Sequence, residues 1–222
     1  MKSVIAKRTP GYRIEVFLLK IKAALYAMLH LSDLLRILRL RGGFEGIQLK
    51  QAELLKIYHA INQFESCRML VFGMGYDSPF WHRINSKGST VFLENLEPWY
   101  EKICSMHPEL EAYLVSYPCK ITQWQELLEK PEGLVMELPE VVRGSSWDVI
   151  LVDGPQGHKY SEEVPGRMSS IFEASRLVKQ NGYVFVHDAE RIVEKTYSQH
   201  FLGKEHFQEK VRGRAMLRIY RF

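Results

Sequence analysis

Hydrophobic and polar residues follow two different periods along most of the chain. Short apolar runs are typical of buried strands, and they alternate with longer segments in which apolar residues recur every three or four positions, as in helices. The runs predict strands at 69–72, 90–94, 112–117, 148–153, 182–187, 205–211 and 214–221. The segments between them predict helices at 48–62, 78–84, 97–106, 123–130, 166–179 and 189–200. This alternation predicts an α/β fold with a Rossmann-like sheet, mostly parallel with an antiparallel final strand and covered by helices on both faces.

The N-terminal region has a different pattern. Residues 13–40 are rich in Leu, Ile and Ala but carry interspersed charges, and the longest uncharged run, 23–32, is shorter than the ~18–20 residues of a membrane span. We therefore expect one long or two short helices in an N-terminal extension, 1–43, ahead of the main domain, 44–222. The apolar residues with roughly helical spacing are Ile14, Phe17, Leu18, Ile21, Leu25, Met28 and Leu29.

This apolar set leaves alternatives open for the extension. It fits a helix packed on the domain or on a second subunit, and it also fits a basic amphipathic helix that lies on a membrane surface. We expect a cytoplasmic protein, peripheral to a membrane if the second alternative holds.

Composition narrows the function classes. The chain has 222 residues, 30 of them basic and 26 acidic, so its net charge of +4 is too mild to indicate nucleic-acid binding. Its three cysteines are widely spaced and form no Cys-x-x-Cys pair, which argues against a zinc knuckle or a disulfide framework.

The first predicted strand of the main domain runs into a glycine turn formed by Gly73 and Gly75, with Asp77 close behind. The next strand ends in Glu94, where nucleotide-binding folds hold ribose hydroxyls. Ser78 stands where a dinucleotide fingerprint has its third glycine. The turn therefore suits S-adenosylmethionine better than a cofactor with a diphosphate. An NAD-type oxidoreductase remains a rival, and Glu94 also fits a solvated carboxylate at a strand end.

Two later strands also end in polar residues. Asp153 is followed at once by Gly154-Pro155, which turns the chain so that the carboxylate can face a cleft. It fits a positioning residue, a general base or a metal ligand, and equally a turn aspartate. His187 and Asp188 end another strand; the histidine suits proton transfer and the aspartate suits cation binding. The alternatives without a role in chemistry are a histidine whose hydrogen bonds are made within the sheet and an aspartate that caps the next helix.

Two further residues are candidates for contact with a substrate. His158 lies in a glycine-flanked loop that can close over a ligand. Arg167 lies in a Pro-Gly-Arg-Met turn that opens a helix, and arginine pairs bidentately with carboxylates.

At these motifs the chain resembles the plant glucuronoxylan 4-O-methyltransferase family, a polysaccharide-biosynthesis domain that also includes the irregular-xylem proteins. The resemblance covers about residues 48–221 and lies in ordered blocks: 71–78, 88–94, 138–140, 147–155, 165–168 and 184–188. It implies an S-adenosylmethionine-dependent methyltransferase fold and transfer to a hydroxyl of a sugar, a uronic acid or a related acceptor.

The same resemblance suggests roles for the motif residues. The cofactor-side set is Gly73, Gly75, Asp77, Ser78 and Glu94, and the set near the acceptor is Asp153, Arg167, His187 and Asp188. Asp153 and Asp188 are also the pair expected to hold a divalent metal, if one assists the reaction. A second rival function is a non-catalytic glycan-assembly protein that keeps the fold. The sequence departs from the plant pattern at Tyr76, where those proteins commonly have a histidine, and in its charged N-terminal helices.

Overall fold

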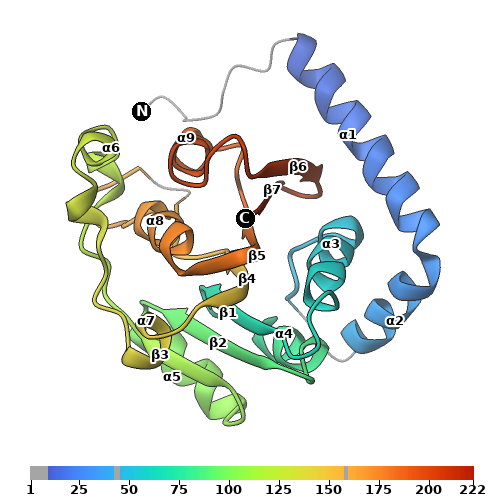
Figure 1. The fold of residues 1–222 in the computed structure, drawn as a ribbon, viewed down its shortest axis with the longest axis horizontal. Helices are drawn as coiled ribbons and strands as arrows, with labels where there is room; N and C mark the ends of the chain where they lie inside the picture. Colours follow the sequence, from blue (N-terminus) through green and yellow to red (C-terminus); the bar gives the residue numbers. More distant parts are fainter. Residues whose placement is uncertain (1–9, 43–45, 158–159) are drawn as a thin grey trace.

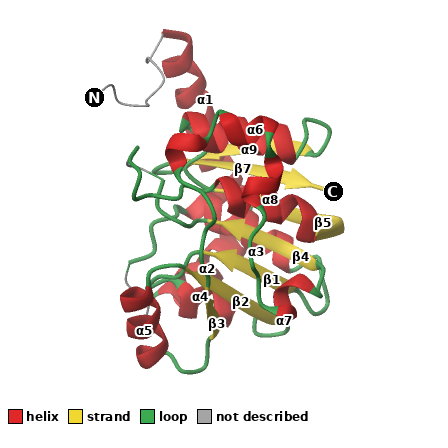
Figure 2. Cartoon of the chain, turned by 90° about the vertical axis from the view of Figure 1, so that its left-hand side faces the viewer, coloured by secondary structure: helices red, strands yellow, loops and turns green. Residues whose placement is uncertain are grey.

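The computed structural model describes residues 10–42, 46–157 and 160–222. Within these ranges, seven strands form one sheet in the order β3-β2-β1-β4-β5-β7-β6, drawn in Figures 1 and 2. The strands are β1 (Arg68–Phe72), β2 (Ser89–Glu94), β3 (Glu111–Leu114), β4 (Trp147–Val152), β5 (Val178–Val186), β6 (Phe207–Arg212) and β7 (Met216–Arg221). The first five are parallel, while β7 runs antiparallel to both of its neighbours. The predicted Rossmann-like sheet with an antiparallel final strand is confirmed.

Helices cover both faces of the sheet, as its two-sided apolar strands require. One core cluster joins α3 (Gln51–Ile61), α4 (Ser78–Ile84) and α5 (Glu97–Met106) to alternate residues of β1 and β4, including Val71 and Leu151. The opposite cluster joins α8 (Met168–Leu177) and α9 (Ile192–Phe201) to the intervening residues, including Phe72 and Val152. Short helices complete this second layer: α6 (Glu126–Glu129), α7 (Glu140–Arg143) and the 3₁₀ turns Ile121–Gln123 and Pro131–Leu134.

The N-terminal extension forms two helices, α1 (Pro10–Leu29) and α2 (Leu31–Arg41), with a break at His30. Figure 1 shows α1 along the outer edge of the molecule, beside β6 and α3. An ion pair between Lys210 of β6 and Glu15 of α1 joins the extension to the sheet. None of the described helices is long and apolar enough to cross a membrane. The boundary between residues 43 and 44 stays a prediction.

The apolar residues of α1 that follow helical spacing face away from the domain. All seven are exposed, from 43% for Ile21 to 81% for Leu29. The face that packs on the body is formed by smaller or polar residues, among them Ala23, Tyr26 and Ala27. The extension therefore packs on the domain, as one alternative expected, but not through this apolar set. Contact of the set with a second subunit or a membrane stays a prediction.

Candidate functional site

The strand ends converge on one cavity of about 650 Å³ between the carboxyl ends of β1, β2, β4 and β5. This is where a ligand is expected in a sheet of this kind. The predicted site residues that line it are Gly73, Gly75, Asp77, Ser78, Glu94, Asp153, Arg167, His187 and Asp188. His158 lies outside the described residues.

Gly73 is required by backbone conformation and by crowding. Its φ of +104° lies in the left-handed region. A Cβ at this position would lie 2.9 Å from the backbone nitrogen of Gly154. The two glycines thus let the turn after β1 touch the turn after β4, which brings the cofactor-side motif next to the Asp153 motif.

The backbone amides of the glycine turn are already bound. Gly73 N donates to Leu93 O (2.8 Å), Met74 N to Glu94 Oε2 (2.9 Å) and Gly75 N to Ser78 Oγ (3.0 Å). A diphosphate would need free amides at such a turn. These bonds therefore favour a ligand without phosphate groups.

Glu94 joins the first turn to the second. Its Oε1 accepts hydrogen bonds from Asn95 N (2.8 Å) and Leu96 N (2.9 Å), while Oε2 accepts from Met74 N. Three backbone donors hold the carboxylate in place, and because each oxygen has two lone pairs, Oε2 keeps one for a ligand hydroxyl. The residue is buried but lines the cavity, which fits the predicted contact with ribose.

Aromatic side chains stand beside Glu94. Trp99 Nε1 donates to Met74 O at 2.6 Å, and the rings of Trp99 and Tyr76 meet edge to face with their centroids 5.1 Å apart. Both rings line the cavity together with Leu96. Such a wall suits a flat heterocycle.

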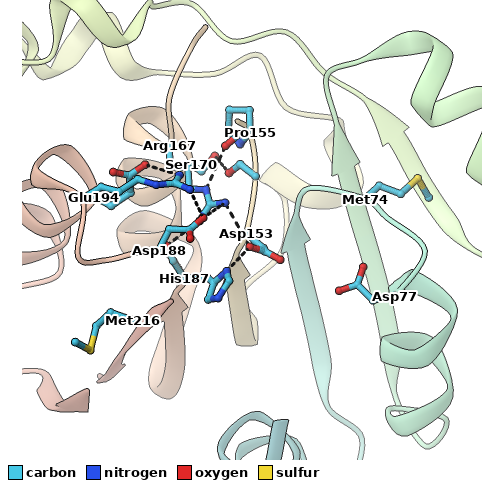
Figure 3. A network of polar contacts seen from close by, with 12 residues as sticks. Met74, Asp77, Asp153, Pro155, Arg167, Ser170, His187, Asp188, Glu194 and Met216 are labelled. Carbon is cyan, nitrogen blue, oxygen red and sulfur yellow. Dashed lines mark hydrogen bonds and ion pairs between the residues drawn. The ribbon is translucent and has the colours of Figure 1, made fainter. Parts of the chain in front are cut away.

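Asp77 lies on the β1 side of the cavity and points toward Asp153 (Figure 3). Its Oδ2 accepts a hydrogen bond from Trp81 Nε1 at 3.1 Å. Burial, followed by the charge of Asp153, raises the pKa of Asp77 to about 6. A negative charge on Asp77 is therefore unfavourable beside that of Asp153.

Asp153 and His187 form a hydrogen-bonded pair across β4 and β5. Oδ1 of Asp153 lies 2.8 Å from Nδ1 of His187. Burial alone raises the pKa of Asp153 and lowers that of His187, but their attraction outweighs it, so the pKa of Asp153 is lowered and that of His187 is raised. The pair therefore favours an ionised carboxylate held by a protonated imidazole.

Arg167 supports both aspartates (Figure 3). Its Nη2 lies 2.9 Å from Asp188 Oδ2 and 3.4 Å from Asp153 Oδ1, and Nη1 donates to His187 O at 2.7 Å. Only 5% of the residue is exposed, and Nε also donates to the carbonyl of Pro155. These contacts are those of a residue that positions the acids; direct contact with a substrate stays a prediction.

Asp188 does not cap the following helix. Its φ of +57° is unusual for a residue other than glycine, and its Oδ2 binds Arg167 and, at 2.8 Å, Arg191. The helix α9 begins later than expected, and its N-cap is Arg191. The left-handed backbone thus serves to place a carboxylate between two arginines.

The arrangement does not favour a divalent metal at Asp153 and Asp188. Ligand atoms of these residues and of His187 lie within 4.8 Å of one another, which is the right donor set. However, the Arg167 guanidinium contacts both carboxylates, so a metal ion between them would have to displace a buried cation with four protein partners. The metal stays a prediction without structural support.

The sequence reasoning missed several residues at the site, among them Glu53, Trp99 and Arg191. Glu53 of α3 is fully buried, with Oε1 3.9 Å from His187 Nε2, and burial raises its pKa to about 6. It lies four positions before Ile57 on the inner face of its helix, and that spacing is the signal that could have found it. Arg191 lines the cavity with a partly exposed side chain, which pairs with Asp188 and Glu194.

The chain is similar to the members of a known protein family. The model of a family described as IRX15/IRX15L/GXM matches residues 52–133 and 131–219. The chain is 38% identical over 169 residues to Glucuronoxylan 4-O-methyltransferase 1 of Arabidopsis thaliana, which covers 67% of this chain and 59% of the relative. It is 31% identical over 195 residues to Arabinogalactan O-methyltransferase 1 of the same plant, with 77% and 65% covered. The chain therefore spans about three fifths of the length of these curated relatives.

Among solved structures, a putative caffeoyl-CoA O-methyltransferase from Staphylococcus aureus aligns with a TM-score of 0.53. The alignment covers 90% of this chain and 99% of that one, at 12% sequence identity. At such low identity the likeness concerns the fold alone.

Proposed function

The chain belongs to the IRX15/IRX15L/GXM family, and from this premise we propose that it is an S-adenosylmethionine-dependent O-methyltransferase. Its acceptor is a hydroxyl of a sugar, a uronic acid or a related molecule, as the names of its glucuronoxylan and arabinogalactan relatives suggest. One observation carries the proposal: the same cavity is lined by Glu94, whose carboxylate accepts three backbone hydrogen bonds, and by Asp153, which is held by His187 and Arg167.

The residues present fit S-adenosylmethionine. Glu94 Oε2 keeps a lone pair for a ribose hydroxyl, Trp99 and Tyr76 provide a wall for adenine, and Gly73 and Gly75 leave room above the turn. When bound, this cofactor supplies an electrophilic methyl group on a sulfonium.

Asp153 is the group best placed to receive the acceptor's proton. Its side chain is 28% exposed toward the cavity, whereas His187 is 6% exposed and its Nε2 is buried without a hydrogen-bond partner. A sugar hydroxyl is a weak nucleophile, so its oxygen attacks as its proton passes to a positioned base, and alignment contributes the rest. His187 and Arg167 keep Asp153 ionised and oriented.

Arg191 suits an acidic acceptor. It is a partly exposed cation among the described residues that line the cavity, and an arginine can bind a uronate carboxylate. We expect Arg191→Gln to raise KM for a uronic-acid acceptor by about tenfold and to leave KM for a neutral one unchanged.

Two rival functions make different demands on the cavity. An NAD-type oxidoreductase needs amide donors for a diphosphate, and those of Gly73, Met74 and Gly75 are already bound to protein acceptors. A non-catalytic protein that keeps the fold would bind the cofactor without turnover.

The test is transfer of a labelled methyl group from S-adenosylmethionine to a panel of acceptors. The panel contains glucuronoxylan oligosaccharides, arabinogalactan and xylan oligosaccharides without uronic acid. We expect label on an acidic glycan as an alkali-stable methyl ether. Tight cofactor binding with no label on any acceptor would favour the non-catalytic alternative, and tighter binding of NAD would favour the oxidoreductase.

The outward face of α1 suits the surface of an anionic membrane. It combines the exposed apolar set with exposed Arg13, Lys20 and Lys22, while the acidic residues Glu15 and Asp33 are engaged by Lys210 and His59. Apolar residues flanked only by free cations complement anionic lipid, whereas two such faces would repel each other.

Vesicle sedimentation tests this contact. The full chain should sediment with vesicles rich in phosphatidylserine, and Phe17→Glu should abolish this while Leu114→Glu, at an exposed leucine on β3, should not. Concentration-dependent dimerisation that Phe17→Glu disrupts, without vesicle binding, would replace the membrane by a second copy.

A further inference from the structure

A second cluster of ligand-type side chains lies outside the lining of the cavity, where three helices meet. His30 is the residue between α1 and α2, Asp33 lies in the first turn of α2, and His59 lies in the last turn of α3. Figure 1 shows this corner, with α2 turning back from the end of α1 beside α3. The cluster therefore joins the N-terminal extension to the main domain.

The three side chains are close enough to share one ion. Each offers a ligand atom, and these atoms all lie within 4.8 Å of one another. His59 Nε2 is 2.9 Å from Asp33 Oδ2, and the ring centroids of His30 and His59 are 4.5 Å apart. All three residues are only partly buried, so an ion can enter from solvent.

The chemistry of the donors matches a borderline transition metal. Two imidazoles and one carboxylate are a frequent ligand set for Zn²⁺, with a water molecule in the fourth position. A tetrahedral site with bonds of about 2.1 Å separates its ligand atoms by about 3.4 Å. The present spacing brackets that value, so small side-chain rotations bring the three atoms to it.

Tyr26 contacts the second ring nitrogen of His59. Its hydroxyl lies 2.6 Å from Nδ1 of His59. A metal-binding histidine usually engages its second ring nitrogen in a hydrogen bond, which fixes the ring and its tautomer. Here that bond leaves Nε2 directed at Asp33.

His30 is the residue that a plain hydrogen-bond network does not account for. Its ring touches those of Tyr26 and His59, yet among the described residues its imidazole makes no hydrogen bond. The hydrogen bonds that join Asp33, His59 and Tyr26 do not require the imidazole of His30. A ring nitrogen of His30 is therefore available to a metal ion.

We propose that His30, Asp33 and His59 bind one Zn²⁺-type ion that fastens the N-terminal helices to α3. Binding replaces the direct contact between His59 Nε2 and Asp33 Oδ2 by bonds from both atoms to the ion. Because the ion links both α1 and α2 to the main domain, it fixes the direction in which the apolar face of α1 points. The site is independent of the proposed catalytic function.

The experiment is a calorimetric titration of Zn²⁺ into the full, metal-stripped chain. We compare the wild type with His30→Ala and Asp33→Asn, and with His82→Ala as a matched control on α4. The wild type and His82→Ala should bind one equivalent that the other two variants lose or bind at least 100-fold more weakly. Saturating Zn²⁺, at about 100 times Kd, should raise the melting temperature of the wild type by about 5–10 °C.

Two features keep this test decisive. All variants retain Asp153, His187 and Asp188, so any ion held there is common to every titration. Co²⁺ gives a second readout, because a tetrahedral site produces visible absorption that His30→Gln should abolish while circular dichroism stays unchanged. The proposal would be overturned if His30→Ala or His30→Gln bound the metal as tightly as the wild type does. It would also be overturned if the wild type bound no metal.

Discussion

Oδ1 of Asp153 lies 2.8 Å from Nδ1 of His187, which ties the acid that faces the cavity to a histidine buried beneath it. The histidine lowers the pKa of the carboxyl and thereby keeps it ionised. It also fixes the direction of the carboxylate.

His187→Gln should alter the pH profile of the reaction. Glutamine can still donate a hydrogen bond to Asp153 but carries no charge, so the pKa of Asp153 should rise and the acid limb of the kcat profile should move up by about one unit. We expect the loss of kcat to be largest at pH values below the shifted limb, about tenfold, with an unchanged KM for S-adenosylmethionine. His200→Gln, at an exposed position on α9, is the control. An acid limb that does not move would show that His187 does not control the pKa of the catalytic carboxyl.

Glu94→Gln should weaken cofactor binding. The wild-type carboxylate accepts three backbone N–H bonds, and an amide has only one oxygen to accept them. We expect the Kd for S-adenosylmethionine, measured by calorimetry, to rise at least tenfold, and the free energy of unfolding to fall by about 1–3 kcal/mol. Glu97→Gln, on the exposed side of α5, should change neither. An unaltered Kd in Glu94→Gln would show that the ribose lies elsewhere.

Gly73→Ala and Gly75→Ala should differ in stability. The first forces a Cβ into the left-handed region and to within 2.9 Å of a backbone nitrogen, whereas the nearest atom to the second is the movable side-chain oxygen of Asp77. Backbone strain alone costs about 1–3 kcal/mol, so Gly73→Ala should be clearly the less stable of the two in denaturant unfolding. Equal losses would mean that the Gly73–Gly154 contact is not what requires glycine.

Glu53 should make the protein less stable as pH rises. Its pKa is raised from 4.5 to about 6 in the folded state, so its contribution is fully present below about pH 4.5 and is lost as pH rises through 6. The shift corresponds to roughly 2 kcal/mol. Denaturant unfolding at pH 4.5 and pH 7.5 should show that Glu53→Gln removes this loss, whereas Glu65→Gln, at an exposed site just after α3, should not. Identical pH slopes for wild type and Glu53→Gln would contradict the assignment.

The sequence predicted the sheet well where strands are apolar and buried on both faces. The predictions at 69–72, 90–94 and 148–153 match β1, β2 and β4 to within one residue at each end. The strand at 182–187 was predicted too short, because β5 begins at Val178 with a polar stretch that includes Asn181, whose φ is +66°. The strand at 112–117 was predicted too long, because β3 is a partly exposed edge strand that ends at Leu114.

Helix ends were harder to predict. The helix expected at 189–200 begins at Ile192, because Asp188 takes a left-handed conformation and forms a turn that periodicity does not reveal. The segment at 123–130 is split into 3₁₀ and α turns, and the four-residue α7 is too short to produce a periodic signal.

The candidate site followed from one topological rule: polar residues at the carboxyl ends of parallel strands meet at one edge. That rule brought Glu94, Asp153 and His187 together without any contact information. It could not find Glu53, because α3 approaches the site from outside the run of strands and a helical glutamate is usually solvated. It also could not determine which way α1 faces, because periodicity reveals an apolar face but not what covers it.

The most direct test of the account is the turnover of Asp153→Asn under saturating S-adenosylmethionine, with cofactor binding measured by calorimetry on the same sample. The amide keeps the size of the side chain but cannot take the acceptor's proton. We predict cofactor binding within about twofold of the wild type and a kcat lower by roughly 10²–10⁴ on an acidic glycan. Full turnover in Asp153→Asn would contradict the central claim that this carboxylate activates the acceptor hydroxyl.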